Sequence, residues 1–296
     1  TRTDGLATSS SRGPANDGRI KPDLGAVGTQ VYSTTDDPVV NSYVRYTGTS
    51  MSCPGITGSL AVMMQAYKDH NGGAEAKGAL LKGMLMNGAD DMGNAGPDFR
   101  YGYGRVNIRK SYDMIANARY FSGTVNNNDS LTFNVNVPAN TAQLKVMLIW
   151  ADPQASTSAA RALVNDLDMT LDDNGTIYQP WVLNPTPNPV LLDNPATRAR
   201  DSLNNMEQIT LMDPSAGSKT VKVKGFNVPS GPQEFFVVYF FEKDEITITY
   251  PQPGDAIAGG NYEFLRWDAP SDYTSNFSIG YSTDGGNTWT PISSST

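Results

Sequence analysis

The stretch TGTSMSCPG, residues 47–55, stands where a loop of small residues runs into a helical pattern. Beyond it, apolar side chains recur at the three- and four-residue spacing of a helix: Ile56, Leu60, Met63, Met64 and Tyr67. We therefore expect Ser50 at the N-terminal end of a helix, with its side chain exposed. The N–H groups and the positive dipole end found there would stabilise an oxyanion, whereas the plainer alternative is that Ser50 only caps the helix.

The rest of the chain divides into three segments of different periodicity. Up to about residue 118, loops alternate with helical patterns, and further helices are predicted around 74–85 and 106–115. Across 119–243 the period changes to two, as in SLTFNVNV and QLKVMLIW, which predicts an all-β sandwich or barrel. The apolar run EFFVVYFF fits a strand buried on both faces. Residues 244–296 are interpreted as a small second β-module, and its shortness against a sandwich of about 100 residues leaves truncation open.

Composition argues against two kinds of partner. The chain has 296 residues and a formal net charge of −8, and an acidic chain repels phosphate backbones, so no nucleic-acid partner is expected. No run of about twenty apolar residues is present, so no membrane span is expected. The single cysteine, Cys53, excludes an internal disulfide. We expect Cys53 to be a small buried hydrophobe rather than a nucleophile.

Residues 9–34, 48–55 and 80–107 of the first segment hold three motifs, and these resemble the subtilase family of serine endopeptidases. GTSMSCPG (48–55) is similar to the family's nucleophile segment, and SSSRGPANDGRIKPDLGAVGTQVYST (9–34) to the approach to it. LLKGMLMNGADDMGNAGPDFRYGYGRVN (80–107) is similar to the segment that follows, and together the motifs cover about residues 8–116. The resemblance implies an α/β fold, part of a subtilisin-like parallel-sheet domain. It also implies that Ser50 attacks a peptide carbonyl of a protein or peptide substrate.

The partners of Ser50 are the open question of this interpretation. In subtilisin the triad follows the order Asp, His, Ser, so the resemblance implies that the Asp, His and oxyanion Asn lie upstream of residue 1. His70, the only histidine, follows Ser50 by twenty residues. Along a helix this separation is roughly 25–30 Å, so His70 is expected to be a structural or surface residue.

Two functions follow as hypotheses. The first is a C-terminal fragment of a secreted, extracellular, bacterial endopeptidase, which is inactive alone and takes the upstream half of its catalytic domain as partner. The second is a pseudoprotease, or an adhesion or binding fragment that acts through its β-modules.

The two β-segments resemble modules that follow catalytic domains of this kind. Residues 119–243 resemble the jelly-roll-like domain of alkaline secreted subtilases, and residues 244–296 resemble Ig-like or fibronectin-like modules. Loop carboxylates of such β-domains often bind calcium, which gives four candidate Ca²⁺ ligands: Asp152, Asp166, Asp168 and Asn205. The alternative for Asp166 and Asp168 is that they only form turns and hydrogen bonds near strand ends.

Overall fold

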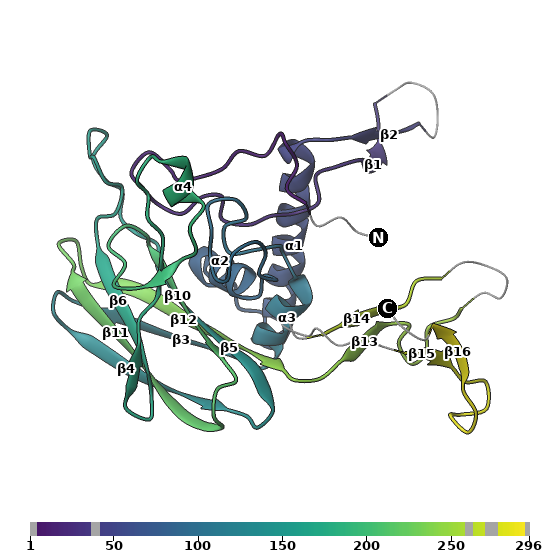
Figure 1. The fold of residues 1–296 in the computed structure, drawn as a ribbon. Coiled ribbons are helices and arrows are strands. Elements are labelled where there is room, and N and C mark those ends of the chain that lie inside the picture. Colours follow the sequence, from purple (N-terminus) through teal and green to yellow (C-terminus); the bar gives the residue numbers. More distant parts are fainter. Residues whose placement is uncertain (1–4, 37–41, 258–262, 270–277, 294–296) are drawn as a thin grey trace. The chain divides into compact units, whose positions relative to one another are not determined.

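The fold was obtained as a computed structural model. The residues that it describes are 5–36, 42–257, 263–269 and 278–293. Backbone contacts divide the chain into two compact units, residues 1–243 and residues 244–296. The first unit combines helices with a β-sandwich, and the second consists of short strand pairs (Figure 1). None of the helices in the described ranges is long and apolar enough to cross a membrane.

The N-terminal part of the first unit contains one strand pair and three helices. Strand β1 (Val31–Thr34) pairs with β2 (Tyr43–Tyr46). The helices that follow are α1 (Thr49–His70), α2 (Gly78–Asn87) and α3 (Ile108–Ala116). All three lie where the hydrophobic spacing predicts a helix.

The parallel sheet expected in this part is not formed by the residues described between 5 and 118. Strands β1 and β2 pair antiparallel, and parallel pairing is limited to an isolated bridge between Gly25 and Arg105. The physical reason is the short connection between the strands, residues 35–42, because a parallel pair needs a crossover of a dozen or more residues. The first unit is therefore a mixed fold of helices and antiparallel sheets.

The remainder of the first unit is a sandwich of two four-stranded antiparallel sheets. The period-two pattern predicts a sandwich or a barrel, and the structure has the sandwich. The strand orders are β10-β5-β12-β3 and β4-β11-β6-β7. The strands are β3 (Tyr120–Val125), β4 (Ser130–Val137), β5 (Thr141–Ile149), β6 (Asp166–Asp173), β7 (Thr176–Tyr178), β10 (Met206–Met212), β11 (Gly217–Asn227) and β12 (Gln233–Lys243). Outside the two sheets lie the paired strands β8 (Trp181–Val182) and β9 (Thr197–Arg198) and the short helix α4 (Pro189–Leu192).

Strand β12 lies between two hydrophobic cores. Val237 packs in the core between the two sheets, whereas its neighbour Val238 packs against the helices, since successive side chains of a strand point to opposite faces. Helix α2 comes close to the sheet at Gly83, where a Cβ would lie 2.7 Å from Ile149 Cγ2. The burial of β12 on both faces confirms the interpretation of EFFVVYFF, and it joins the helical part to the sandwich.

The described part of the second unit forms two antiparallel strand pairs. Strand β13 (Thr247–Tyr250) pairs with β14 (Arg266–Asp268), and β15 (Ile279–Tyr281) pairs with β16 (Thr290–Ser293). The sequence DGGN lies in the connection of the second pair and forms the hairpin that it predicts. The Ig-like assignment of this unit stays a prediction, as does a domain boundary between residues 118 and 119.

Candidate active site

Ser50 is the second residue of α1, and its side chain is exposed. The N-cap of the helix is Gly48, and no side chain caps the helix by a hydrogen bond. The alternative that Ser50 merely caps the helix is therefore wrong, and the predicted exposed serine at a helix N-terminus is confirmed. The Met51 N–H donates to Gly48 O at 3.0 Å. The N–H groups of Thr49 and Ser50 come before it, where a helix offers no acceptor of its own, so they can face a negative charge beside Ser50.

A close backbone approach holds the first turn of α1 in place. Gly28 O accepts a hydrogen bond of 2.8 Å from Gly48 N, and Ala26 O accepts one of 3.2 Å from Ser52 Oγ. A Cβ at residue 28 would lie 2.2 Å from Ser52 Oγ, so only glycine allows this approach. The segment 25–28 thus fixes the backbone on which Ser50 is presented.

A cavity of about 760 Å³ borders the same helix start. Its wall includes Thr49, Ser52 and Ile56 of α1, and segment 24–29 lines another side. Residues described between 5 and 11 line it as well. The start of α1 therefore lies next to an open space large enough to receive further protein or peptide groups.

The structure agrees with the expectation for His70 and disagrees with the expectation for Cys53. His70 is the last residue of α1, and its Nε2 lies 3.2 Å from Tyr112 Oη, so it has the structural surroundings that the sequence predicts. Twenty residues of helix correspond to about 30 Å, far beyond hydrogen-bond reach of Ser50. Cys53, in contrast, is exposed, and the expectation of a buried hydrophobe is wrong because Cys53 lines the open cavity at the start of α1.

The four calcium candidates are held by protein contacts. Asp152 accepts hydrogen bonds from Val164 N (2.7 Å) and Asn165 N (2.9 Å). The Asn205 side chain donates to Trp150 O. No group of three or more His, Cys, Asp or Glu side chains arranged to hold a metal ion occurs in the described ranges. Calcium binding stays a prediction.

Asp166 and Asp168 do lie together, with Arg200 between them. Arg200 Nε donates to Asp168 Oδ2 at 3.0 Å, and Arg200 Nη2 contacts Asp166 Oδ2. Burial raises the pKa of Asp166 to about 6 although Arg200 opposes the shift. The structure therefore brings these two candidates together around a guanidinium group, in keeping with the hydrogen-bonding alternative.

A buried acid near this pair is not predicted by any pattern in the sequence. Glu207 on β10 is 1% exposed, and its Oε2 accepts a 2.6 Å hydrogen bond from Met169 N in the opposite sheet. Burial, followed by the charge of Asp201, raises the pKa of Glu207 well above its ordinary value.

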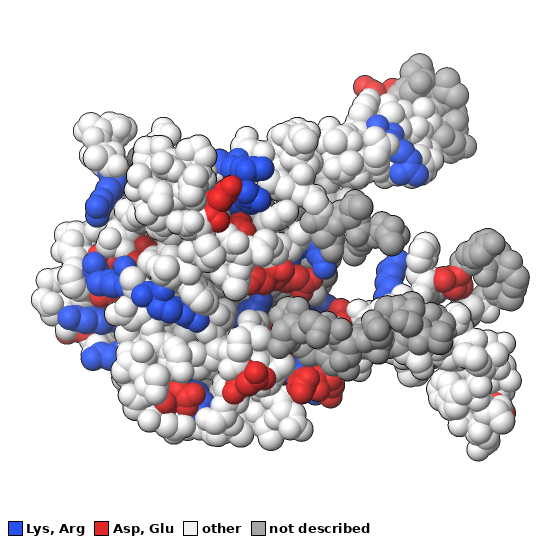
Figure 2. All heavy atoms as spheres, in the orientation of Figure 1, with Lys and Arg blue, Asp and Glu red and all other residues white. Residues whose placement is uncertain are grey.

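Elsewhere, acidic and basic side chains are interspersed over the sandwich face that Figure 2 shows.

Comparison with known proteins identifies the first part of the chain. Residues 1–104 match the model of the subtilase family. The serine protease/ABC transporter B family protein tagA of Dictyostelium discoideum is 25% identical over 264 residues, which cover 76% of this chain and 15% of that protein. An extracellular serine protease of Serratia marcescens is 36% identical over 93 residues, 31% of this chain and 8% of that protein. Among solved structures, fervidolysin from Fervidobacterium pennivorans, a keratinolytic enzyme related to subtilisin, aligns at 19% identity and a TM-score of 0.29 over 71% of this chain and 32% of that chain.

These matches concern a part of larger proteins. The chain spans 15%, 17% and 16% of the length of tagA and of two related Dictyostelium proteins, tagD and tagB. The matched range includes Ser50 and all of α1. Residues 1–104 of the chain thus match the subtilase family.

Proposed function

We propose that Ser50 is the nucleophile of a serine endopeptidase that cleaves peptide bonds in proteins. The observation that carries the proposal is an exposed serine hydroxyl in the first turn of α1, within a segment of the subtilase family. Ser50 Oγ attacks the peptide carbonyl carbon, and the Ser50 backbone N–H stabilises the oxyanion that forms. The chemistry needs a general base within about 3 Å of the Ser50 hydroxyl.

The base and its orienting acid come, in this proposal, from a segment outside residues 1–296. Support comes from composition and from geometry, because the sequence holds a single histidine and His70 contacts Tyr112 at the far end of α1. The triad order Asp, His, Ser of subtilisin agrees with an upstream source. The chain by itself is then inactive, although it carries the nucleophile.

The bare side of α1 is the surface on which this upstream half packs. Val62 and Met64 are 59% and 46% exposed, and a Cβ at Gly55 or Gly58 would have no neighbour within 4 Å. Small residues on a helix permit close contact with another backbone. Exposed apolar side chains cost free energy in water, and contact with a second body would remove that cost. The cavity lined by Thr49 and Ser52 lies at the start of the same helix.

The β-segments would support the enzyme rather than perform the chemistry. The strand orders β10-β5-β12-β3 and β4-β11-β6-β7 support a jelly roll, which consists of eight strands in two sheets. The extracellular serine protease of Serratia marcescens supports secretion. An Ig-like second unit and calcium at Asp152, Asp166, Asp168 and Asn205 complete the proposal.

Labelling with a fluorophosphonate probe tests this function directly. The whole protein that carries this chain should be labelled, and Ser50→Ala should abolish the label, because the probe reacts only with an activated serine. Ser59→Ala is the matched control on the same helix, since the Ser59 hydroxyl donates a 2.8 Å hydrogen bond to Gly55 O. Residues 1–296 alone should stay unlabelled. An unlabelled whole protein would contradict the proposal and favour a pseudoprotease or a binding fragment.

A further inference from the structure

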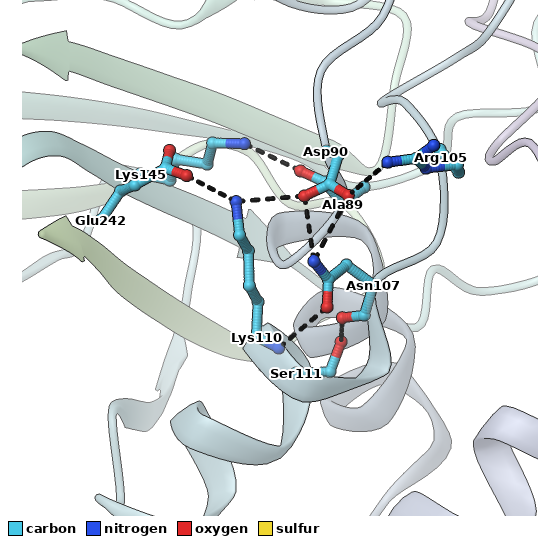
Figure 3. Close-up of polar contacts among 8 residues, drawn as sticks. All are labelled: Ala89, Asp90, Arg105, Asn107, Lys110, Ser111, Lys145 and Glu242. Atoms are coloured by element: carbon cyan, nitrogen blue, oxygen red, sulfur yellow. Dashed lines mark hydrogen bonds and ion pairs between the residues drawn. The ribbon is translucent and has the colours of Figure 1, made fainter. Parts of the chain in front are cut away.

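A buried chain of ion pairs joins helix α3 to the sandwich. Lys110 Nζ lies 2.6 Å from Glu242 Oε1 on β12 and 3.0 Å from Asp90 Oδ1 (Figure 3). The side chains of Lys110 and Glu242 are only 12% and 7% exposed, so neither charge can readily exchange its partner for water. Burial alone would raise the pKa of Asp90, but the charge of Lys110 and a hydrogen bond from Asn107 lower it. Asp90 is therefore held as a carboxylate in one position.

Asp90 in turn holds Arg105 by an ion pair and by backbone hydrogen bonds. Arg105 Nη2 lies 3.1 Å from Asp90 Oδ2, and the two backbones exchange N–H···O bonds of 2.8 Å in both directions. A Cβ at Gly104 would lie 2.1 Å from Asp90 O, and its φ of +114° favours glycine. A second sandwich strand holds the same turn, because the buried Lys145 of β5 donates from Nζ to Ala89 O at 2.8 Å. Two strands of one sheet thus fix residues 89–90 (Figure 3).

The residue after Arg105 continues the connection to α1. Val106 N donates a 2.9 Å hydrogen bond to Gly25 O. The next residue along, Ala26, accepts the bond from Ser52 Oγ, and Ser52 stands two positions after Ser50 in the first turns of α1. Every link beyond the ion pairs involves backbone atoms, which have less freedom to move than surface side chains.

We propose that Lys110 and Glu242 are positioning residues for Ser50. They fix Asp90 and, through it, the segment 25–28 on which α1 begins. This inference rests on the proposed function of Ser50. Neither residue lies at the serine, so they act on its position, and a displacement of about 1 Å can cost about 10²-fold in rate. The sandwich is then part of the catalytic unit and not only an attached module.

Hydrogen exchange on residues 1–296 tests this chain of contacts without any activity. Lys110→Met keeps the aliphatic stem and removes the charge, and we expect the amides of Gly48 and Val106 to exchange at least about tenfold faster. Lys110→Arg keeps a charged donor and should return both amides to within about threefold of the wild type. The matched control is Lys77→Met: Lys77 also pairs with β12, at 2.6 Å from Glu234 Oε1, but it is 64% exposed and off the path. It should leave both amides unchanged.

A second variant guards against general unfolding. Lys110→Met leaves Glu242 buried without its partner, which destabilises folds, so Lys110→Met/Glu242→Gln is measured beside it. The amide of Val146 in the middle of β5 reports whether the sandwich core is intact. If Val146 exchange rises as much as Gly48 exchange in both variants, or if Lys77→Met has the same effect, the positioning role is overturned.

Kinetics of the whole protein test the consequence for Ser50. Lys110→Met should lower kcat about tenfold or more while KM changes less than about twofold, because substrate contacts are retained. Lys110→Arg should recover most of kcat. Unchanged kcat in Lys110→Met would overturn the positioning role. A whole protein without any Ser50-dependent hydrolysis would instead overturn the proposed function, and the exchange of Gly48 would still decide the contact chain.

Discussion

Replacing Gly28 by alanine should loosen the start of α1. The new Cβ would lie 2.2 Å from Ser52 Oγ and 2.7 Å from Gly48 O. The Ser52 hydroxyl can rotate away and give up its bond to Ala26 O, whereas Gly48 O is a backbone atom and moves only with its segment. Overpacking costs about 1–3 kcal/mol and one hydrogen bond about 1 kcal/mol, so unfolding should become easier by about 2–4 kcal/mol.

Urea unfolding of residues 1–296, followed by far-ultraviolet circular dichroism, measures this effect as a lower midpoint. Gly58→Ala is the matched control, because a Cβ at this position of α1 has nothing within 4 Å and alanine is better than glycine inside a helix by roughly 0.5–1 kcal/mol. The control should therefore unfold at the same or a higher urea concentration. A Gly28→Ala midpoint equal to that of the wild type would refute the close approach on which the geometry of the site depends.

Three further outcomes are expected. In the whole protein, Ser50→Ala should lower kcat by about 10⁶-fold, the loss known for subtilisin, while Ser59→Ala keeps the wild-type rate in a peptide hydrolysis assay. Burial raises the pKa of Glu207 in the folded state. Above the unfolded-state pKa of about 4.3, the folded state therefore binds more protons than the unfolded state, and its stability falls as pH rises. Glu207→Gln should make this fall shallower in urea midpoints measured across pH. Because Arg200 sits between two calcium candidates, Arg200→Ala should enlarge the rise in Tm on adding calcium, and Asp168→Asn should remove it.

The helices and the position of Ser50 follow from local patterns in the sequence. The spacing of Ile56, Leu60 and Met63 fixes the course of α1, and small residues before Ser50 mark its start. The run EFFVVYFF predicts burial on both faces of β12, because its apolar residues do not alternate with polar ones. These features depend on neighbours in the chain, which is why they can be read without a structure.

The contacts around Lys110 could not be read in this way. Lys110 and Glu242 are 132 positions apart, and neither stands in a motif that predicts a partner. Lys145 has the appearance of a polar residue in an alternating strand, yet it is buried against the turn at Ala89. The partner of a charged residue between two layers depends on which faces of the two layers meet. The periodicity of the sequence does not determine that pairing of faces. The exposure of Cys53 has the same origin, because it depends on what covers α1.

The burial of the helices indicates how much of the site the sandwich can support. Helix α2 buries seven of its ten residues, since it packs on β5 and β12, whereas α1 buries only Met63 and Ala66 of its 22 residues. A helix that is apolar around most of its circumference needs cover on more than one side. The sandwich provides cover on the side of α2 and α3, and through Lys110 it fixes the backbone at the start of α1. The other side of α1, next to Ser50, needs a second body, and our proposal assigns the general base to that body. Nucleophile and base would then meet only when both sides of α1 are covered, so completion of the fold and completion of the catalytic site would be one event.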